Sequence, residues 1–395
     1  MVTAKPAIRA TAESAVRDAA EVLVGLSHRI HAHPELGWHE YRASGWVGEV
    51  LAAAGYAVEA GIGGFPTALR ATAGSGPLHV GLCAEYDALP GLGHACGHNL
   101  IAAMAVGAAL GLRGVADDLG LTVTVLGTPA EEGGGGKIEL LDAGAFDDIH
   151  FALMAHPGPA DLMEIQPLAV AHSHIRFEGK TAHAAAFPER GINAADAFTV
   201  AEVAVGLLRQ QLLPHVRVHG IRTRSGNAPN AIPDLAEGRW YVRANSLAEL
   251  RGLEDRVWDC FRAGALATGS ALTIEPESQH YSEMINDPDL VAIFSQCWRD
   301  TTGRQDLPPG QDNAIGRAST DMANVSLVLP AIHPFIGIGP CSAVNHQPEF
   351  AAHCATPEAD AALLHGAVAL ALTAAEAASD PRVSSRLATS RQPRA

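Results

Sequence analysis

The fold of this chain is decided by residues 78–112, where an apolar run leads through a polar connection into an apolar helix. The connection, Glu85 to Asn99, has the sequence Glu-Tyr-Asp-Ala-Leu-Pro-Gly-Leu-Gly-His-Ala-Cys-Gly-His-Asn. The preceding run, 78–83, has the composition of a buried strand, and the following run, 100–112, is rich in Ala and Leu, as buried helices are. In open α/β sheets, ligands bind at such strand-to-helix connections.

The connection carries two candidate metal ligands. Cys96 and His98 are separated by one glycine, so both side chains can reach one ion. Thiolate and imidazole groups bind Zn²⁺ and similar ions at ~2.0–2.3 Å. These two residues by themselves predict a single metal site and say nothing about its chemistry.

Two later strands end in residues of the same kind. The alternating strand 121–126 is followed by Glu131 and Glu132 and then by four glycines. Adjacent acids can divide two roles, one binding a metal and the other acting as general base, although a charged flexible loop would show the same pattern. The strand 149–155 ends at His156. A lone histidine is more often structural, but three such strand ends in succession predict a metal site at one edge of the sheet.

The order of the expected strands and helices changes near residue 170. The expected elements are then a strand at 174–178, a helix at 193–212, strands at about 215–224 and 235–244, a helix at 247–266 and a strand at 271–279. This β-α-β-β-α-β order is that of a ferredoxin-like α+β domain. We therefore expect an α/β chain whose catalytic domain, 1–170 and 284–380, is interrupted by a domain at 171–283. The segment 381–395 is rich in Ser, Arg and Pro and is expected to be a disordered tail.

The composition is that of an acidic protein with a large apolar fraction. A formal net charge of −16 argues against sequence-independent nucleic-acid binding, which needs clustered Lys and Arg. Six cysteines in 395 residues do not suggest a disulfide framework, so reduced thiols and a cytoplasmic location are expected. No secretory signal is visible at the N-terminus. The apolar run 363–377 contains His365 and Glu376, so no membrane span is expected.

Four motifs together resemble a known family. They are Glu-Tyr-Asp-Ala-Leu-Pro-Gly at 85–91, His-Ala-Cys-Gly-His-Asn at 94–99, Ser-Thr-Asp-Met at 319–322 and Ile-His-Pro at 332–334. The chain resembles the dinuclear metallopeptidases and amidohydrolases related to aminoacylase, carboxypeptidase G and hippurate hydrolase. Within that family it is most similar to the branch of p-aminobenzoyl-glutamate hydrolase and the Xaa-Arg dipeptidases. The resemblance covers about residues 25–380.

The resemblance implies a mixed-sheet, zinc-peptidase-like catalytic domain with an inserted lid and dimerisation domain, two bound divalent ions and a homodimer. Glu131 matches the general acid/base, and Asp87 matches an acid beside the metals. His183 matches a histidine that reaches the partner subunit's active site. Other branches have a metal-binding His at the position of Glu85, so the preferred ion, Zn²⁺ or Mn²⁺, stays open. The implied metal ligands are Cys96, His98, Glu132, His156 and His346.

The expected reaction is hydrolysis of the amide bond of a small N-acyl amino acid or dipeptide by a metal-activated water. A free carboxylate on the substrate would be bound by Asn230, Asn227 or Arg222 of the inserted domain, although Arg222 and Arg224 could equally form a solvated strand edge. One alternative keeps the metals but cleaves a ureide, a carbamoyl group or a xenobiotic amide. Another is a catalytically silent binding protein of the same fold, against which the intact ligand set and Glu131 argue.

Overall fold

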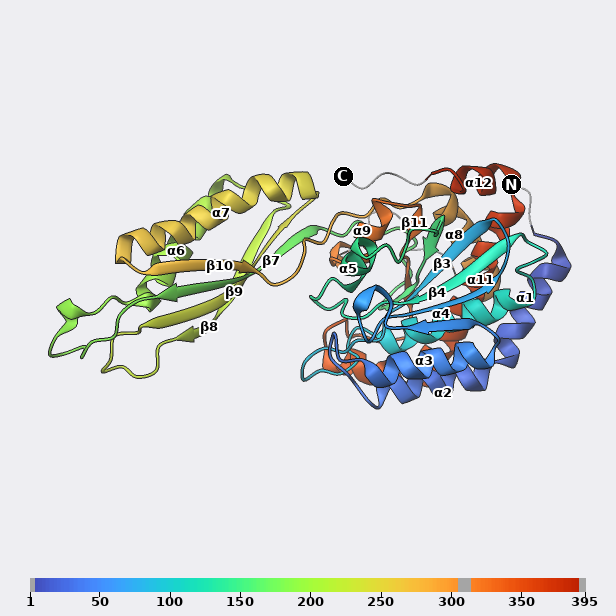
Figure 1. The fold of residues 1–395 in the computed structure, drawn as a ribbon, viewed down its shortest axis with the longest axis horizontal. Coiled ribbons are helices and arrows are strands. Elements are labelled where there is room, and N and C mark those ends of the chain that lie inside the picture. The colour runs from blue at the N-terminus through green and yellow to red at the C-terminus, as the bar shows by residue number, and fades with distance from the viewer. Residues whose placement is uncertain (1–3, 305–313, 391–395) are drawn as a thin grey trace. The chain divides into compact units, whose positions relative to one another are not determined.

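The computed structural model describes residues 4–304 and 314–390, which fold into two compact units. Unit 1 comprises residues 1–166 and 284–395, and unit 2 is the insert Pro167–Glu283 (Figure 1). The insert begins at Pro167 rather than at the expected 171, because its first strand already starts at Ala169. Each unit has its own hydrophobic core.

Unit 1 is built on a six-stranded mixed sheet with the strand order β1-β2-β4-β3-β5-β11. Strands β3, β4, β5 and β11 are parallel to one another, whereas β1 and β2 add an antiparallel edge. The strands are β1 (Ala57–Ala60), β2 (Leu69–Gly74), β3 (Leu78–Ala84), β4 (Leu121–Gly127), β5 (Phe151–Leu153) and β11 (Ala331–Ile332). The central strand β3 is buried almost throughout and β4 completely, as expected for parallel strands covered on both faces.

The helices of unit 1 surround this sheet (Figure 1). Helix α4 packs on β3 and β4 and is itself covered by α1, α2, α3 and α11, which explains why nearly all of its residues are apolar. The helices are α1 (Pro6–Asp18), α2 (Ala20–His31), α3 (Tyr41–Ala53), α4 (His98–Arg113), α5 (Gly136–Asp142), α8 (Pro288–Thr302), α9 (Met322–Ser326), α10 (Pro348–His353), α11 (Pro357–Ser379) and α12 (Pro381–Leu387).

Helix α11 is long and apolar enough to cross a membrane by length and composition. In the structure, 78% of the most apolar 18-residue stretch of this helix is buried, mainly against α4 and α8. Burial in the protein core therefore accounts for its apolar sequence.

The predicted disordered tail is wrong for its first part, because Pro381–Leu387 forms helix α12. The side chain of Asp380 caps this helix by accepting hydrogen bonds from the backbone N–H groups of Arg382 and Val383. Arg386 donates to both carboxylate oxygens of Asp287, at 2.7 and 2.8 Å. This local cap and the contact with the distant Asp287 order a segment whose composition alone suggested disorder.

Unit 2 has the ferredoxin-like element order expected from the sequence. Its antiparallel sheet has the order β10-β7-β9-β8, and α6 and α7 cover one face (Figure 1). Alternate residues of β7 and β9, such as Phe177 and Trp240, are buried in its core. The elements are β7 (Ala169–Glu178), α6 (Ala194–Leu208), β8 (Arg217–Ser225), β9 (Leu235–Ala244), α7 (Leu247–Thr268) and β10 (Ala271–Pro276).

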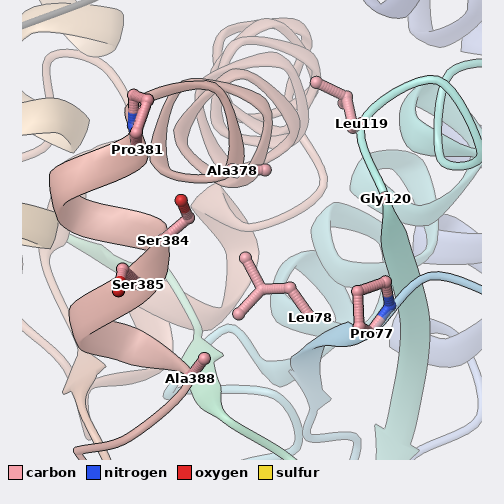
Figure 2. Close-up of a pocket in the computed structure, with 9 residues that line it drawn as sticks. All are labelled: Pro77, Leu78, Leu119, Gly120, Ala378, Pro381, Ser384, Ser385 and Ala388. Atoms are coloured by element: carbon pink, nitrogen blue, oxygen red, sulfur yellow. The ribbon is translucent and has the colours of Figure 1, made fainter.

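A surface pocket of about 330 Å³ lies between α12 and the beginnings of β3 and β4 (Figure 2). Its lining is mostly apolar and includes Leu78, Leu119, Pro381 and Ala388. Leu78 is the first residue of β3, so this pocket lies at the opposite end of the strand from the predicted metal ligands. The pocket is therefore not the predicted site.

Candidate metal centre

The candidate site lies where the parallel strands β3, β4 and β5 end. Ala84 at the end of β3 is paired with Gly127 at the end of β4, and Leu82 is paired with Leu153 at the end of β5. The loops that follow these strands therefore begin side by side at one edge of the sheet. The structure brings together the five candidate ligands and Glu131 at this edge.

Cys96 lies between two of the candidate histidines. Its Sγ atom is 3.7 Å from Nε2 of His156 and 3.6 Å from Nε2 of His346. His156 lies in a separate short strand, β6 (His156–Gly158), that pairs with β12 (Phe335–Gly337), rather than at the end of β5. Its Nδ1 atom contacts the carbonyl oxygen of Pro157 at 2.8 Å, which leaves Nε2 for the site.

The short connection between Cys96 and His98 depends on glycine. Gly97 has φ +79°, and a Cβ atom there would lie 2.4 Å from Cγ of Pro157. This close approach brings the loop that carries Cys96 and His98 against the strand that carries His156.

His98 is fully buried and is oriented by Asp87. Its Nδ1–H group donates to Oδ1 of Asp87 at 2.9 Å, which directs Nε2 toward the candidate ligands. The other oxygen of Asp87 accepts a hydrogen bond from the backbone N–H of Glu132 at 2.9 Å. Burial by itself would lower the pKa of His98, but Asp87 holds it well above its ordinary value. Asp87 therefore holds two parts of the site in place.

Glu132 and Glu131 face the same centre from the loop after β4. Oε1 of Glu132 lies 3.6 Å from Nε2 of His346 and 4.0 Å from Nε2 of His98. Oε2 of Glu131 lies 3.9 Å from Nε2 of His98. Burial, together with the neighbouring carboxylates Glu85 and Glu132, raises the pKa of Glu131 well above its ordinary value. A carboxyl group with a raised pKa is a better proton acceptor than an ordinary carboxylate, which suits a general acid/base.

The donor set fits a pair of divalent cations. Among the described residues, three buried polar atoms that converge here have no hydrogen-bond partner: Oε2 of Glu85, Nε2 of His98 and Oε1 of Glu132. Native proteins rarely leave such atoms unsatisfied, so they indicate an absent partner. Two donors, each ~2.1 Å from one tetrahedral ion, lie about 3.4 Å apart, close to the separations found here. Cys96 belongs to two overlapping donor groups, one with His98 and His156 and one with Glu132 and His346.

A buried ion network beside the centre has no role assigned by the sequence. Lys137, at the start of α5, contacts Oε1 of Glu85 and lies 2.7 Å from Oδ1 of Asp321, and all three side chains are fully buried. Burial by itself would lower the pKa of Lys137, but Asp321 and Glu85 hold it well above its ordinary value. Glu85 and Asp321 stand in the motifs quoted above, but their common partner is a lysine that no motif marks.

The other predicted site residues lie in unit 2. His183 is exposed, and its segment pairs with that of Asn230, since the N–H of Ala184 donates to the carbonyl of Asn230 at 3.0 Å. Oδ1 of Asn227 accepts a hydrogen bond from Arg224 at 3.3 Å. Arg222 is bound by Glu202 of α6, with Nε 2.7 Å from Oε1. The structure thus brings His183 and Asn230 together and gives Arg222 a partner within the protein.

The fold and the donor set are those of a metal-binding α/β protein. The chain belongs to peptidase family M20/M25/M40, whose sequence model matches residues 81–376. This confirms the family, the mixed α/β fold and the hydrolytic enzyme class predicted from the motifs.

Individual relatives fit the same family. The chain is 40% identical over 384 residues to Xaa-Arg dipeptidase from Mus musculus, covering 93% of this chain and 88% of that protein. It is 33% identical over 264 residues to one of the subunits of p-aminobenzoyl-glutamate hydrolase from Escherichia coli, covering 62% of this chain and 55% of that protein. A dinuclear metal-binding M20 peptidase from Bacillus subtilis aligns with a TM-score of 0.65 at 19% identity, covering 91% of this chain and 98% of that one. At that identity the structural likeness shows the fold alone.

Proposed function

We propose that the protein is a dinuclear metal-dependent amidohydrolase that cleaves a dipeptide or a small N-acyl amino acid, with Zn²⁺ or Mn²⁺ as the ions. The observation that carries the proposal is the pair of adjacent carboxylates after β4. Glu132 belongs to the donor group of Cys96 and His346, while the neighbouring Glu131 lies with Glu85 and His98 and has a raised pKa. The names of the relatives, Xaa-Arg dipeptidase and p-aminobenzoyl-glutamate hydrolase, support an amide substrate.

Metal binding, proton transfer and ligand orientation fall to different residues of the site. Cys96, His98, His156, Glu132 and His346 would hold two divalent ions, which would polarise the amide carbonyl and lower the pKa of a water. Glu131 takes a proton from the attacking water and returns it to the leaving amine. A carboxylate bound to a metal could not carry that proton, and so the two adjacent acids have separate tasks. Asp87 orients His98 and the backbone of Glu132.

In this proposal, residues of unit 2 contact the substrate. His183 would stabilise the negative charge on the carbonyl oxygen during attack, and Asn230 and Asn227 would bind the substrate carboxylate. The pairing of the segments of His183 and Asn230 supports a joint role for these two residues. Arg222 is the weaker candidate, since it would have to leave Glu202 to bind substrate.

We also propose a cytoplasmic homodimer that forms through unit 2, with His183 acting in the partner's site. Two observations support the dimer. Strand β8 is an edge strand, and Ile221 on it is 63% exposed. Val203 and Leu207 on α6 are 60% and 69% exposed and lie one turn apart, so that a partner could cover both. The six free thiols support a reducing compartment.

The test is a substrate panel with purified protein loaded with Zn²⁺ or Mn²⁺. The panel holds dipeptides with C-terminal Arg or Lys, aminobenzoyl-glutamate, N-acetyl amino acids, a ureide and an N-carbamoyl amino acid. Cleavage of a dipeptide or an N-acyl amino acid, lost on chelation and restored by metal, is the expected result. Cleavage of the ureide or the carbamoyl compound alone would replace the proposed substrate class. Binding of substrates without turnover would indicate a silent relative.

A further inference from the structure

A further buried carboxylate, outside the candidate metal centre, contacts the loop that carries Glu131. Glu40, just before α3, has no exposed surface. Its Oε1 atom accepts a hydrogen bond from the backbone N–H of Ala130 at 2.8 Å. Its Oε2 atom has no hydrogen-bond partner among the described residues. Burying a carboxylate is costly, and therefore the contact with Ala130 is expected to matter.

The backbone that Glu40 holds is in an unfavourable conformation. Ala130 has φ +56°, a region that residues with a Cβ atom rarely adopt. Its Cβ is packed between two glycines: a Cβ atom added at Gly37 would lie 3.0 Å from it, and one added at Gly134 would lie 2.7 Å from it. This close packing thus holds the backbone of Ala130 in a left-handed turn, immediately before Glu131.

The same region holds the backbone on both sides of Glu131. Glu40 accepts from the N–H of Ala130, and Asp87 accepts from the N–H of Glu132. The segment that precedes Glu40 also contacts the loop of Asp87, since the N–H of Ala88 donates to the carbonyl oxygen of Glu35 at 2.8 Å. Two buried carboxylates therefore fix the backbone on either side of Glu131, and with it the direction in which its side chain leaves the backbone.

We propose that Glu40 is a positioning residue for Glu131: by holding the N–H of Ala130, it keeps the left-handed turn that aims the general acid/base at the substrate. This inference rests on the proposed function, in which Glu131 carries the proton. Glu40 touches neither substrate nor metal in this scheme. Its removal should therefore lower the rate of chemistry and leave substrate binding and metal content unchanged.

The first test compares Glu40→Ala, Glu40→Gln and the matched control Glu35→Gln. Glu35 lies on the same segment, but its carboxylate accepts from the N–H groups of Arg42 and Ala43 and does not contact Ala130. For Glu40→Ala we expect kcat to fall ~10–100-fold with KM and bound metal unchanged. Glu40→Gln keeps an acceptor oxygen and should stay within about threefold of the wild type, as should the control. Hydrogen exchange in a peptide covering 127–137 should accelerate in Glu40→Ala alone.

A second test uses the strain at Ala130. Glycine adopts a positive φ without strain, so the double variant Glu40→Ala with Ala130→Gly should have a higher kcat than Glu40→Ala alone. If the two substitutions acted independently, the second would not restore kcat lost through the first. Wild-type kcat in Glu40→Ala, or equal losses in all three single variants, would overturn the role of Glu40. If the proposed role of Glu131 fails instead, Glu131→Gln will stay active. Should Glu40→Ala not fold, Glu40→Asp withdraws the carboxylate from Ala130, and the same outcomes apply to it.

Discussion

The Nδ1 atom of His98 lies 2.9 Å from Oδ1 of Asp87, in a part of the protein where both side chains are fully buried. This pair decides which nitrogen of His98 faces the candidate metal centre, because the ring nitrogen bound to the carboxylate cannot also bind an ion. The same carboxylate holds the N–H of Glu132. One residue thus orients ligands from two loops.

Asp87→Asn should weaken metal binding more than it weakens the fold. The amide cannot accept from Nδ1–H and from the N–H of Glu132 as a carboxylate does, so His98 loses its fixed orientation. Loss of such a partner typically costs ~10–100-fold in metal affinity. Competition with a fluorescent chelator measures the affinity, and thermal unfolding of the metal-free protein measures the fold. An unchanged affinity would show that Asp87 is not needed to orient His98.

Glu131→Gln and Glu132→Gln should separate chemistry from metal binding. Glu131→Gln is expected to lower kcat by ~10²–10⁴-fold while two ions remain bound, since only the proton carrier is lost. Glu132→Gln is expected to lose metal, because an amide is a weaker ligand than a carboxylate. Elemental analysis beside steady-state kinetics checks both. A Glu131→Gln enzyme with near-normal turnover would refute its role as general acid/base.

Lys137→Met should strongly destabilise unit 1. The substitution keeps the length of the side chain but leaves Glu85 and Asp321 as buried carboxylates without a cation. Breaking a buried ion pair in this way typically costs ~3–5 kcal/mol, measured here as the change in the free energy of unfolding in urea. The double variant Lys137→Met with Asp321→Asn should be less unstable than the single one. Arg262→Ala, which breaks an exposed pair with Asp259, is the control and should change little.

Stability should depend on pH through Glu40. Burial, with the nearby charge of Asp87, raises the pKa of Glu40 from 4.5 to about 7. Between these two values the folded state holds a proton that the unfolded state has lost, so this contribution to stability is present below pH 4.5 and is lost as the pH rises through about 7. The free energy of unfolding of Glu40→Gln relative to the wild type should therefore increase with pH across that interval. A constant difference would show that the pKa of Glu40 is not raised in the folded state.

Leu207→Asp should disrupt the proposed homodimer. Leu207 is 69% exposed on α6, and a buried charge in a subunit interface would prevent association. Sedimentation or size-exclusion chromatography with light scattering should then report a monomer. Val22→Asp on α2 is the matched control, since Val22 is 52% exposed and belongs to unit 1 rather than to unit 2. Mixed Glu131→Gln and His183→Ala subunits should recover activity if His183 acts in the partner's site.

Much of the fold could be predicted because its signals are local. The strand β9 covers residues 235–244, the range expected from the sequence, and α4 contains the whole of the predicted buried helix at 100–112. The position of His156 was predicted less well. It lies in the separate strand β6, because Phe335 of β12 pairs with it, and a pairing partner about 180 residues away leaves no local signal.

The sequence by itself predicted Cys96, His98, Glu131 and Glu132, since each follows a strand that its own composition reveals, and parallel strands end at a common edge. His346 came only from the family resemblance. Only the tertiary structure decided how those ligands are held. Lys137 joins Glu85 to Asp321, Glu40 reaches Ala130, and Asp87 orients both His98 and Glu132. The reason is physical. The sequence does not reveal whether a charged side chain lies in water or in the core. Its role depends on which distant groups the fold places beside it.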